Sequence, residues 1–191
     1  MWHVEDYARL EPLATEYLEL ARKLGDRSAT ADALLLLART ALHHADHARA
    51  AALSEESLAL SRAQRDKVAA VRAMVSLADV AVQQGMPDRA DALYREGLVL
   101  AAELGDRWWF TLCLEGMVAC ETSRSRFTRA ATLLGAAAEL RKAIGSQHPA
   151  PTRENTGQIA RETLGEQRFT EAWARGRAMN QDDLVAFALE A

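Results

Sequence analysis

Apolar residues recur every three or four positions along most of the chain, which is the spacing of one face of an α-helix. One such stripe consists of Ala90, Leu93, Tyr94, Gly97, Leu98, Ala101 and Leu104, and another of Val71, Met74, Val75, Ala78, Ala81 and Val82. β-Branched residues never gather into the alternating run that a strand requires. The pattern therefore predicts an all-α protein.

The helical pattern repeats along the chain at a fixed interval. The segments LELARKLGD, LALSRAQRD and LVLAAELGD end at Asp26, Asp66 and Asp106, so they superimpose at a constant offset, and a weaker copy ends at Ser146. The same offset relates three small residues that we expect at helix crossings, namely Ala50, Ala90 and Ala130. Because each interval holds two helical stripes, the predicted repeat unit is a pair of helices.

Turn-forming residues mark the ends of these helices. Gly25-Asp26 and Gly105-Asp106 stand between one unit and the next, where glycine ends a helix in the left-handed conformation and aspartate caps the following one. Within the units, the breaks fall at Asp46-His47, Gly85 to Pro87 and Ser125-Arg126. These signals predict tight helical hairpins.

The pattern divides the chain into three parts. Residues 1–146 are predicted to form helical repeats of about 40 residues each, with the first unit incomplete because only its second helix is present. Turn formers crowd residues 147–157, which we expect to be a linker. Residues 158–191 hold three short amphipathic segments, and we expect them to cap the repeats.

Small and medium-sized residues occur at a characteristic spacing in the second complete unit, at Leu77, Ala78, Gly85, Ala90, Tyr94, Gly97 and Leu98. This spacing resembles that of the tetratricopeptide repeat, lengthened here to about 40 residues, and the resemblance covers residues 6–146. The resemblance implies a right-handed superhelix of helical hairpins. Two features depart from it: Leu34, Met74 and Leu114 replace the usual aromatic residue, and Glu121 stands where other units have Ala41 and Ala81.

In tetratricopeptide arrays the first helices of the units line a concave face that receives an extended peptide or a small ligand. Carried over position by position, the resemblance implies a groove formed by three helices. Its residues are Asp32, Leu35, Arg39, Leu42, His43, Arg72, Val75, Asp79, Val82, Gln83, Leu112, Glu115, Ala119, Thr122 and Ser123. Such a mixture of charged and aliphatic side chains would hold a peptide by both kinds of contact.

The last third of the chain carries a narrower likeness. AATLLGAAAELRKAIGSQHPAP followed by LGEQRFTEAWARGRAMNQDDLVAFALE resembles the C-terminal end of LuxR-type ATP-binding bacterial transcription regulators. In those proteins an ATPase module precedes a helical repeat sensor region. The likeness implies that this chain is the C-terminal sensor part of a larger bacterial signalling regulator. The sequence has no phosphate-binding loop of the form GxxxxGK, so it does not contain the ATPase.

Charge and hydropathy narrow the expected partners. A net charge of −4 and a pI near 5.8 give no general attraction to nucleic acid or anionic lipid. The sequence lacks an apolar run long enough for a membrane span, and its first residues are unlike a signal peptide. We therefore expect a cytoplasmic protein that binds a protein, a peptide or a small molecule. Cys113 and Cys120 are expected to be reduced and buried.

Two clusters invite a chemical interpretation. His43, Asp46 and His47 would suit a metal ion on one helix face, but they fall at a predicted turn and lack the glutamate of HExxH, so we expect a solvated turn and no cofactor. A basic cluster near the third unit could contact phosphate, but a solvated turn is again the expectation. That cluster consists of Arg124, Arg126 and Arg129.

Three consecutive aromatic residues, Trp108, Trp109 and Phe110, open the first helix of the third unit. At least one ring is expected in the hairpin core, and a ring left outside would be an anchor for a partner. The spacing of serines, cysteines and acids assembles no nucleophile with a base, so we expect no catalytic residues. The sequence predicts a noncatalytic interaction module, or alternatively a sensor whose groove binds a small inducer.

Overall fold

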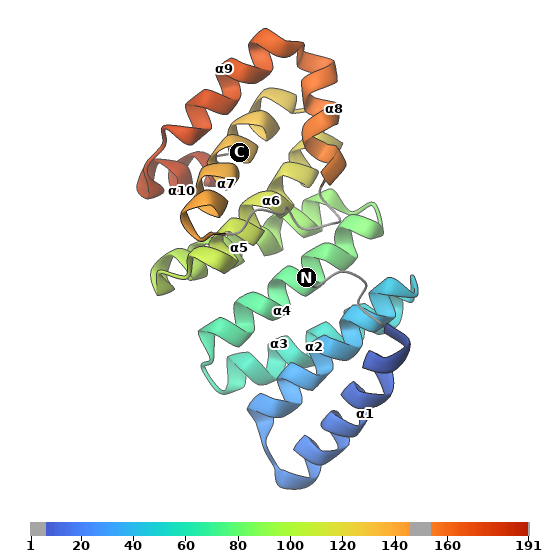
Figure 1. Ribbon diagram of the computed structural model, residues 1–191. Helices are drawn as coiled ribbons and strands as arrows, with labels where there is room; N and C mark the ends of the chain where they lie inside the picture. The colour runs from blue at the N-terminus through green and yellow to red at the C-terminus, as the bar shows by residue number, and fades with distance from the viewer. Residues whose placement is uncertain (1–6, 146–153, 191) are drawn as a thin grey trace.

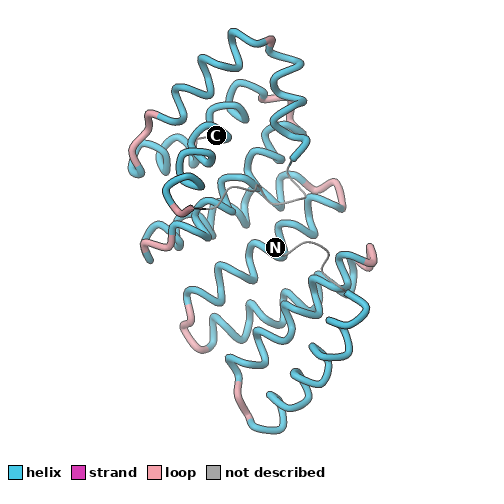
Figure 2. Tube along the Cα trace, in the orientation of Figure 1, coloured by secondary structure: helices cyan, strands magenta, loops and turns pink. Residues whose placement is uncertain are grey.

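The protein is built of helices and short turns (Figure 2). The computed structural model describes residues 7–145 and 154–190, and those residues include no strand, which confirms the predicted all-α class. The helices are α1 (Tyr7–Leu24), α2 (Arg27–His43), α3 (His47–Ala63), α4 (Lys67–Gln83), α5 (Pro87–Leu104), α6 (Arg107–Ser123), α7 (Phe127–Ala143), α8 (Glu154–Leu164), α9 (Glu166–Arg177) and α10 (Gln181–Leu189).

The turns follow a strict spacing. A residue with positive φ recurs at a constant interval, at Gly25, Ala45, Arg65, Gly85, Gly105, Ser125, Gly145 and Gly165. Each repeat unit thus consists of two equal steps, and each step is one helix and one turn. The predicted caps are confirmed at Asp26 and Asp106, whose carboxylates accept hydrogen bonds from backbone N–H groups in the first turns of α2 and α6.

Helices α1 to α7 pack each against the next in chain order (Figure 1). The even-numbered helices also contact one another, because α4 touches both α2 and α6. These three helices therefore form one layer of the stack. Ala50, Ala90 and Ala130 are completely buried, as expected of small residues where helices cross closely.

The C-terminal helices depart from this succession. Helix α9 lies along α7 and takes the extensive contact that α8 would make if the pattern continued. Two glycines allow the close approach. A Cβ on Gly135 of α7 would lie 2.2 Å from the carbonyl oxygen of Trp173, and one on Gly176 of α9 would lie 1.8 Å from that of Thr132.

The predicted linker needs a correction at its end. Helix α8 begins at Glu154, so residues 154–157 are helical. Gly157 reads as a turn former in the sequence, but it packs within α8, where a Cβ would lie 2.6 Å from Cδ2 of Leu134. Residues 147–153 of that linker, and residues 1–6 of the first unit, lie outside the described residues. The three amphipathic segments predicted after the linker correspond to α8, α9 and α10.

Candidate binding groove

A groove lies along the layer formed by α2, α4 and α6. It has a volume of about 360 Å³. Its lining combines five aliphatic side chains and one indole ring with four polar or charged side chains, and consists of Leu35, Leu36, Arg39, Leu42, Arg72, Val75, Ser76, Asp79, Trp109 and Leu112.

The charged groups of the groove are held in place by neighbouring side chains. Arg72 of α4 forms an ion pair with Asp32 of α2 at 2.7 Å between nitrogen and oxygen. Asp79 accepts a hydrogen bond of 2.5 Å from the hydroxyl group of Tyr94, which projects from α5. Because Arg72 and Asp79 are tethered, the groove presents these two charges in fixed directions beside an apolar wall.

The three aromatic residues at the start of α6 have different environments. Phe110 is buried in the core, which confirms that at least one ring points inward, whereas Trp108 is 47% exposed. Trp109 is half-buried and lines the groove. The carboxylate of Asp106 accepts hydrogen bonds from the backbone N–H groups of both tryptophans, which fixes the first turn from which Trp109 projects.

The structure brings together about half of the residues predicted for the groove. Those that line it are Leu35, Arg39, Leu42, Arg72, Val75, Asp79 and Leu112. Asp32 contributes indirectly through its ion pair with Arg72. The others do not line it: His43, Val82, Gln83, Glu115, Ala119, Thr122 and Ser123. Several of these have other partners, since the His43 ring stacks on Tyr7 and the Thr122 and Ser123 hydroxyl groups donate to carbonyls of their own helix.

Leu36, Ser76 and Trp109 also line the groove but are not among the residues predicted for it, although Trp109 is one of the three aromatic residues from which the sequence offers an anchor for a partner. Leu36 and Ser76 are separated by one repeat length, so they occupy equivalent positions in two units, next to predicted residues. Leu36 directly follows Leu35 and Ser76 directly follows Val75, so a predicted groove face one residue wider on each helix includes both. Trp109 could have been found only from the size of its side chain, because the other units carry Ala29 and Ala69 at that position.

Glu115 was predicted to face the groove, but it is buried in a bidentate ion pair with Arg141 of α7. Ser61 and Ala101 occupy the positions in α3 and α5 that correspond to Arg141. A guanidinium group in the protein interior needs a carboxylate partner, and Glu115 supplies it from the neighbouring helix. The ion pair therefore turns Glu115 toward α7.

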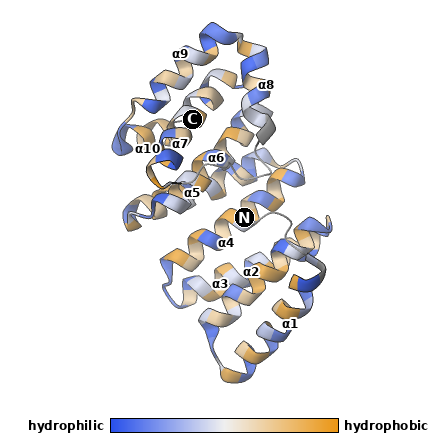
Figure 3. Ribbon diagram, viewed as in Figure 1, coloured by the Kyte–Doolittle hydropathy of each residue, from blue (hydrophilic) through white to orange (hydrophobic). Residues whose placement is uncertain are grey.

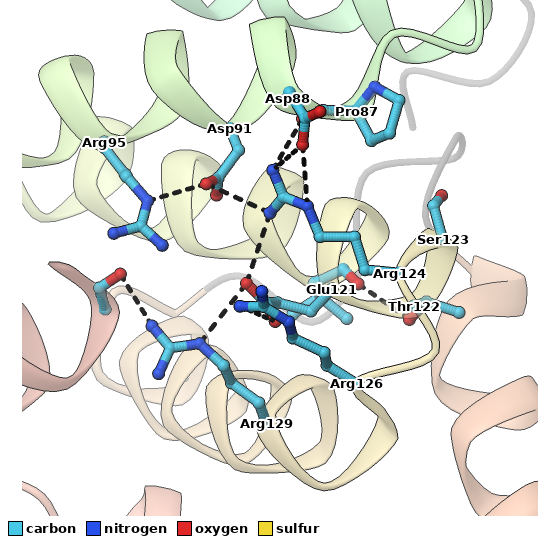
Figure 4. Close-up of polar contacts among 12 residues, drawn as sticks. Pro87, Asp88, Asp91, Arg95, Glu121, Thr122, Ser123, Arg124, Arg126 and Arg129 are labelled. Atoms are coloured by element: carbon cyan, nitrogen blue, oxygen red, sulfur yellow. Dashed lines mark hydrogen bonds and ion pairs between the residues drawn. The ribbon is translucent and has the colours of Figure 1, made fainter. Parts of the chain in front are cut away.

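Of the basic cluster, Arg126 is exposed at the turn, as expected, but Arg124 and Arg129 are mostly buried, unlike the solvated turn that the sequence suggests (Figure 4). Arg124 is mostly buried and pairs with Asp88 at 2.7 Å and Asp91 at 3.2 Å. Glu121 is fully buried, with the guanidinium nitrogens of Arg124 at 3.6 Å and of Arg129 at 3.4 Å from its Oε1. Burial alone would lower the pKa of Arg124, but its hydrogen bonds to Asp88 and the charge of Asp91 raise it, so the side chain stays charged.

Arg95 and Arg129 hold the C-terminal end of α10. Arg129 donates from one nitrogen to the carbonyls of Phe187, Ala188 and Glu190, and Arg95 donates to those of Leu189 and Glu190. The last carbonyls of a helix lack partners within the helix and carry partial negative charge, which these guanidinium groups neutralise. The arginines Arg124 and Arg129 are thus engaged by protein acceptors, and their role here is structural.

Within residues 7–145 and 154–190, no group of three His, Cys, Asp or Glu side chains could hold a metal ion. His43 is the last residue of α2 and His47 the first of α3, so the turn separates them. Cys113 and Cys120 are both buried. None of the described helices is long and apolar enough to cross a membrane.

No protein-family model matches the sequence. A search of the curated proteins likewise found no match.

Proposed function

We propose that this chain is a noncatalytic binding module whose groove between α2, α4 and α6 holds a peptide of a partner protein. One observation carries the proposal: the groove combines an apolar wall and the Trp109 ring with charged groups held in fixed directions. An aliphatic or aromatic side chain of the peptide would pack against Trp109 and the leucines. Acidic groups beside it would face Arg39 and Arg72, and a basic group would face Asp79.

The likeness of residues 130–190 to regulator C-termini extends this proposal. It makes the chain the C-terminal sensor part of a larger cytoplasmic bacterial regulator, in which peptide binding by the helical repeats controls the output. The tetratricopeptide resemblance supports the same use of the groove, because such repeats bind extended peptides on the face lined by their first helices.

The size of the groove favours a second candidate, a small inducer molecule. The groove has a volume of about 360 Å³, which is at the lower end of the range of small-molecule sites. A compound that binds only the folded protein raises its melting temperature. Screening sugars, amino acids and nucleosides for such a rise, and repeating each hit on Trp109→Ala, would test this candidate.

The peptide proposal is tested by selecting binders from a random peptide library and measuring their affinity for variants. Trp109→Ala is expected to weaken binding about tenfold or more, because the ring is an apolar anchor within the groove. Trp108→Ala is the matched control, since the neighbouring indole is exposed outside the groove and its loss should leave the affinity unchanged. Binders that respond equally to both substitutions, or an empty selection, would refute the proposal.

A further inference from the structure

The arginine in the first turn of α7 departs from a pairing that the preceding units follow. Arg49 and Arg89 are the equivalents of Arg129 in α3 and α5, at offsets of two repeat lengths and one. Arg49 pairs with Glu11 of α1 at 2.7 Å. Arg89 pairs with Glu55 of α3 at 2.9 Å. By the same pattern, Arg129 would pair with an acid of α5.

An acid stands at the corresponding place in α5, but other arginines hold it. Asp91 is the equivalent of Glu11 at two repeat lengths. Its carboxylate pairs with Arg95 at 2.8 Å and with Arg124 at 3.2 Å (Figure 4). Arg129 instead donates from Nη2 to three of the last carbonyls of the chain, at the end of α10. Helix α10 thus receives the hydrogen bonds that a carboxylate receives in the first unit.

This arrangement leaves buried carboxylate oxygens without hydrogen bonds. Among the described residues, Oδ1 of Asp91 and both side-chain oxygens of Glu121 have no hydrogen-bond partner, and the same holds for Nε of Arg129. That nitrogen lies 3.4 Å from Oε1 of Glu121, near enough for charge attraction. A buried acceptor without a donor is unfavourable. The two carboxylates and α10 therefore compete for one guanidinium group.

Helix α10 is lightly attached to the helices that it contacts. It has nine residues, of which Leu184 and Ala188 are the buried ones. Its first turn is hydrophilic and the rest is hydrophobic (Figure 3). A helix of this length is not stable alone in water. If α10 left α5 and α7, it would unfold, and its amide hydrogens would become accessible to solvent.

We propose that α10 is a releasable latch with two states. In the closed state, which the structure shows, Arg129 binds the carbonyls at the end of α10. In the open state α10 is detached, and Arg129 pairs with Asp91 and Glu121, as Arg49 pairs with Glu11. Opening loses hydrogen bonds to α10 but supplies a donor to buried carboxylates, so the two losses offset each other in part. This latch is independent of any ligand in the groove.

Hydrogen exchange of the full chain tests the release itself. We expect the amide hydrogens of α10 to exchange about a hundredfold or more faster than those of α7, after correction for intrinsic rates, because α10 opens without its neighbour. Exchange of α10 at the rate of α7 would show that the two helices open together, and would overturn the latch.

A double-mutant cycle tests the change of partner. Leu184→Ser removes a buried leucine from α10 and should hold the latch open, whereas Leu189→Ser is the matched control because that leucine is 40% exposed. In each background, Asp91→Asn and Arg129→Met are introduced singly and together, and urea unfolding gives their coupling. We expect the coupling to be about fivefold or more larger, as a factor in the unfolding equilibrium constant, when the latch is open.

Equal or smaller coupling in the Leu184→Ser background would show that Arg129 does not transfer to Asp91, and would overturn the proposal. Circular dichroism of Leu184→Ser shows whether the remaining helices stay folded. If they do not, Leu184→Ala replaces it, since the smaller loss of apolar surface opens the latch while destabilising the fold less. The same comparison with Leu189→Ala then decides between transfer and no transfer.

Discussion

Individual small residues determine how closely the helices of this protein approach. Gly116 of α6 faces the ring of Tyr94 so closely that an added Cβ would lie 2.2 Å from the ring carbon Cζ. The hydroxyl group of the same tyrosine donates to Asp79 in the groove. A glycine in the core thus controls the position of a charged group at the candidate binding site.

Gly116→Ala is therefore expected to destabilise the fold by about 1–3 kcal/mol, because the buried Tyr94 ring has to move. Urea unfolding measures the loss. Gly97→Ala is the matched comparison, since its added Cβ would lie 3.1 Å from the Cys113 sulfur and 3.9 Å from side-chain carbons of Met74 and Val71, so the expected loss is smaller. Equal stability of Gly116→Ala and the unchanged protein would contradict the packing described here.

The capping aspartates act locally at the starts of the helices. Asp106→Ala removes the acceptor for the N–H groups of Trp108 and Trp109, and should cost about 1 kcal/mol in the free energy of unfolding. Asp106→Asn retains an acceptor oxygen and should cost little. Thermal unfolding tests this: a lower melting temperature for Asp106→Ala alone indicates loss of the cap. Equal lowering in both variants would indicate a general effect of substitution.

Among the helices, α9 is the one that covers α7, and two glycines make this possible. Gly176→Ala places a methyl group against the backbone of Thr132, which cannot move aside, so we expect a loss of about 3 kcal/mol. Gly157→Ala also adds a methyl group, but it meets the end of the flexible Leu134 side chain and should cost less. A larger loss for Gly157→Ala in chemical denaturation would show that the α7 and α9 backbones are farther apart.

Helix α10 depends on the arginines at its C-terminal end. Arg129→Met removes hydrogen bonds to three carbonyls and a countercharge beside the buried Glu121, and should cost about 3 kcal/mol. We expect the amide hydrogens of α10 to exchange faster with solvent. Arg126→Met is the control, because that arginine is 48% exposed and its nearest contact with Glu121 is 3.9 Å long. Unchanged exchange in Arg129→Met would show that α10 is held by its apolar contacts alone.

The elements that could be predicted are those with local signals. Asp26 and Asp106 carry their capping chemistry in the side chain, and the glycines before them adopt positive φ readily. Ala45, Arg65 and Ser125 adopt the same backbone conformation without such a residue type, so only the repeat indicates their turns. The packing of α9 on α7 joins glycines far apart in sequence, which no local pattern reveals.

The candidate groove was predictable to the extent that the repeat carries it. Arg39, Arg72 and Asp79 were found because first helices were expected to face one side together. Trp109 differs from Ala29 and Ala69 at the equivalent positions of the other units, and its large side chain is what reaches the groove. The burial of Glu115 could not be predicted from its repeat position, because its partner Arg141 comes from α7 and the other units have Ser61 and Ala101 at the position of Arg141.

The molecule as a whole is a succession of neighbouring contacts, so we expect its stability to vary along the chain. Helices far apart in sequence share few contacts, as in other repeat arrays. Leu34→Ala removes a fully buried side chain from α2 and should cost about 2–5 kcal/mol. Hydrogen exchange is expected to increase mainly in α1, α2 and α3. An equal increase in α6 and α7 would indicate that the chain unfolds as one cooperative unit.

The regular placement of the turns, at equal intervals along the chain, restricts how such a protein can change its length. Loss of a single helix with its turn would reverse the layer to which every later helix belongs, so that residues now facing the groove would lie on the opposite side. Loss or gain of two consecutive helices leaves the order of layers intact. Insertions and deletions that preserve the binding surface should therefore come in pairs of helices, and the groove should lengthen or shorten by one helix at a time.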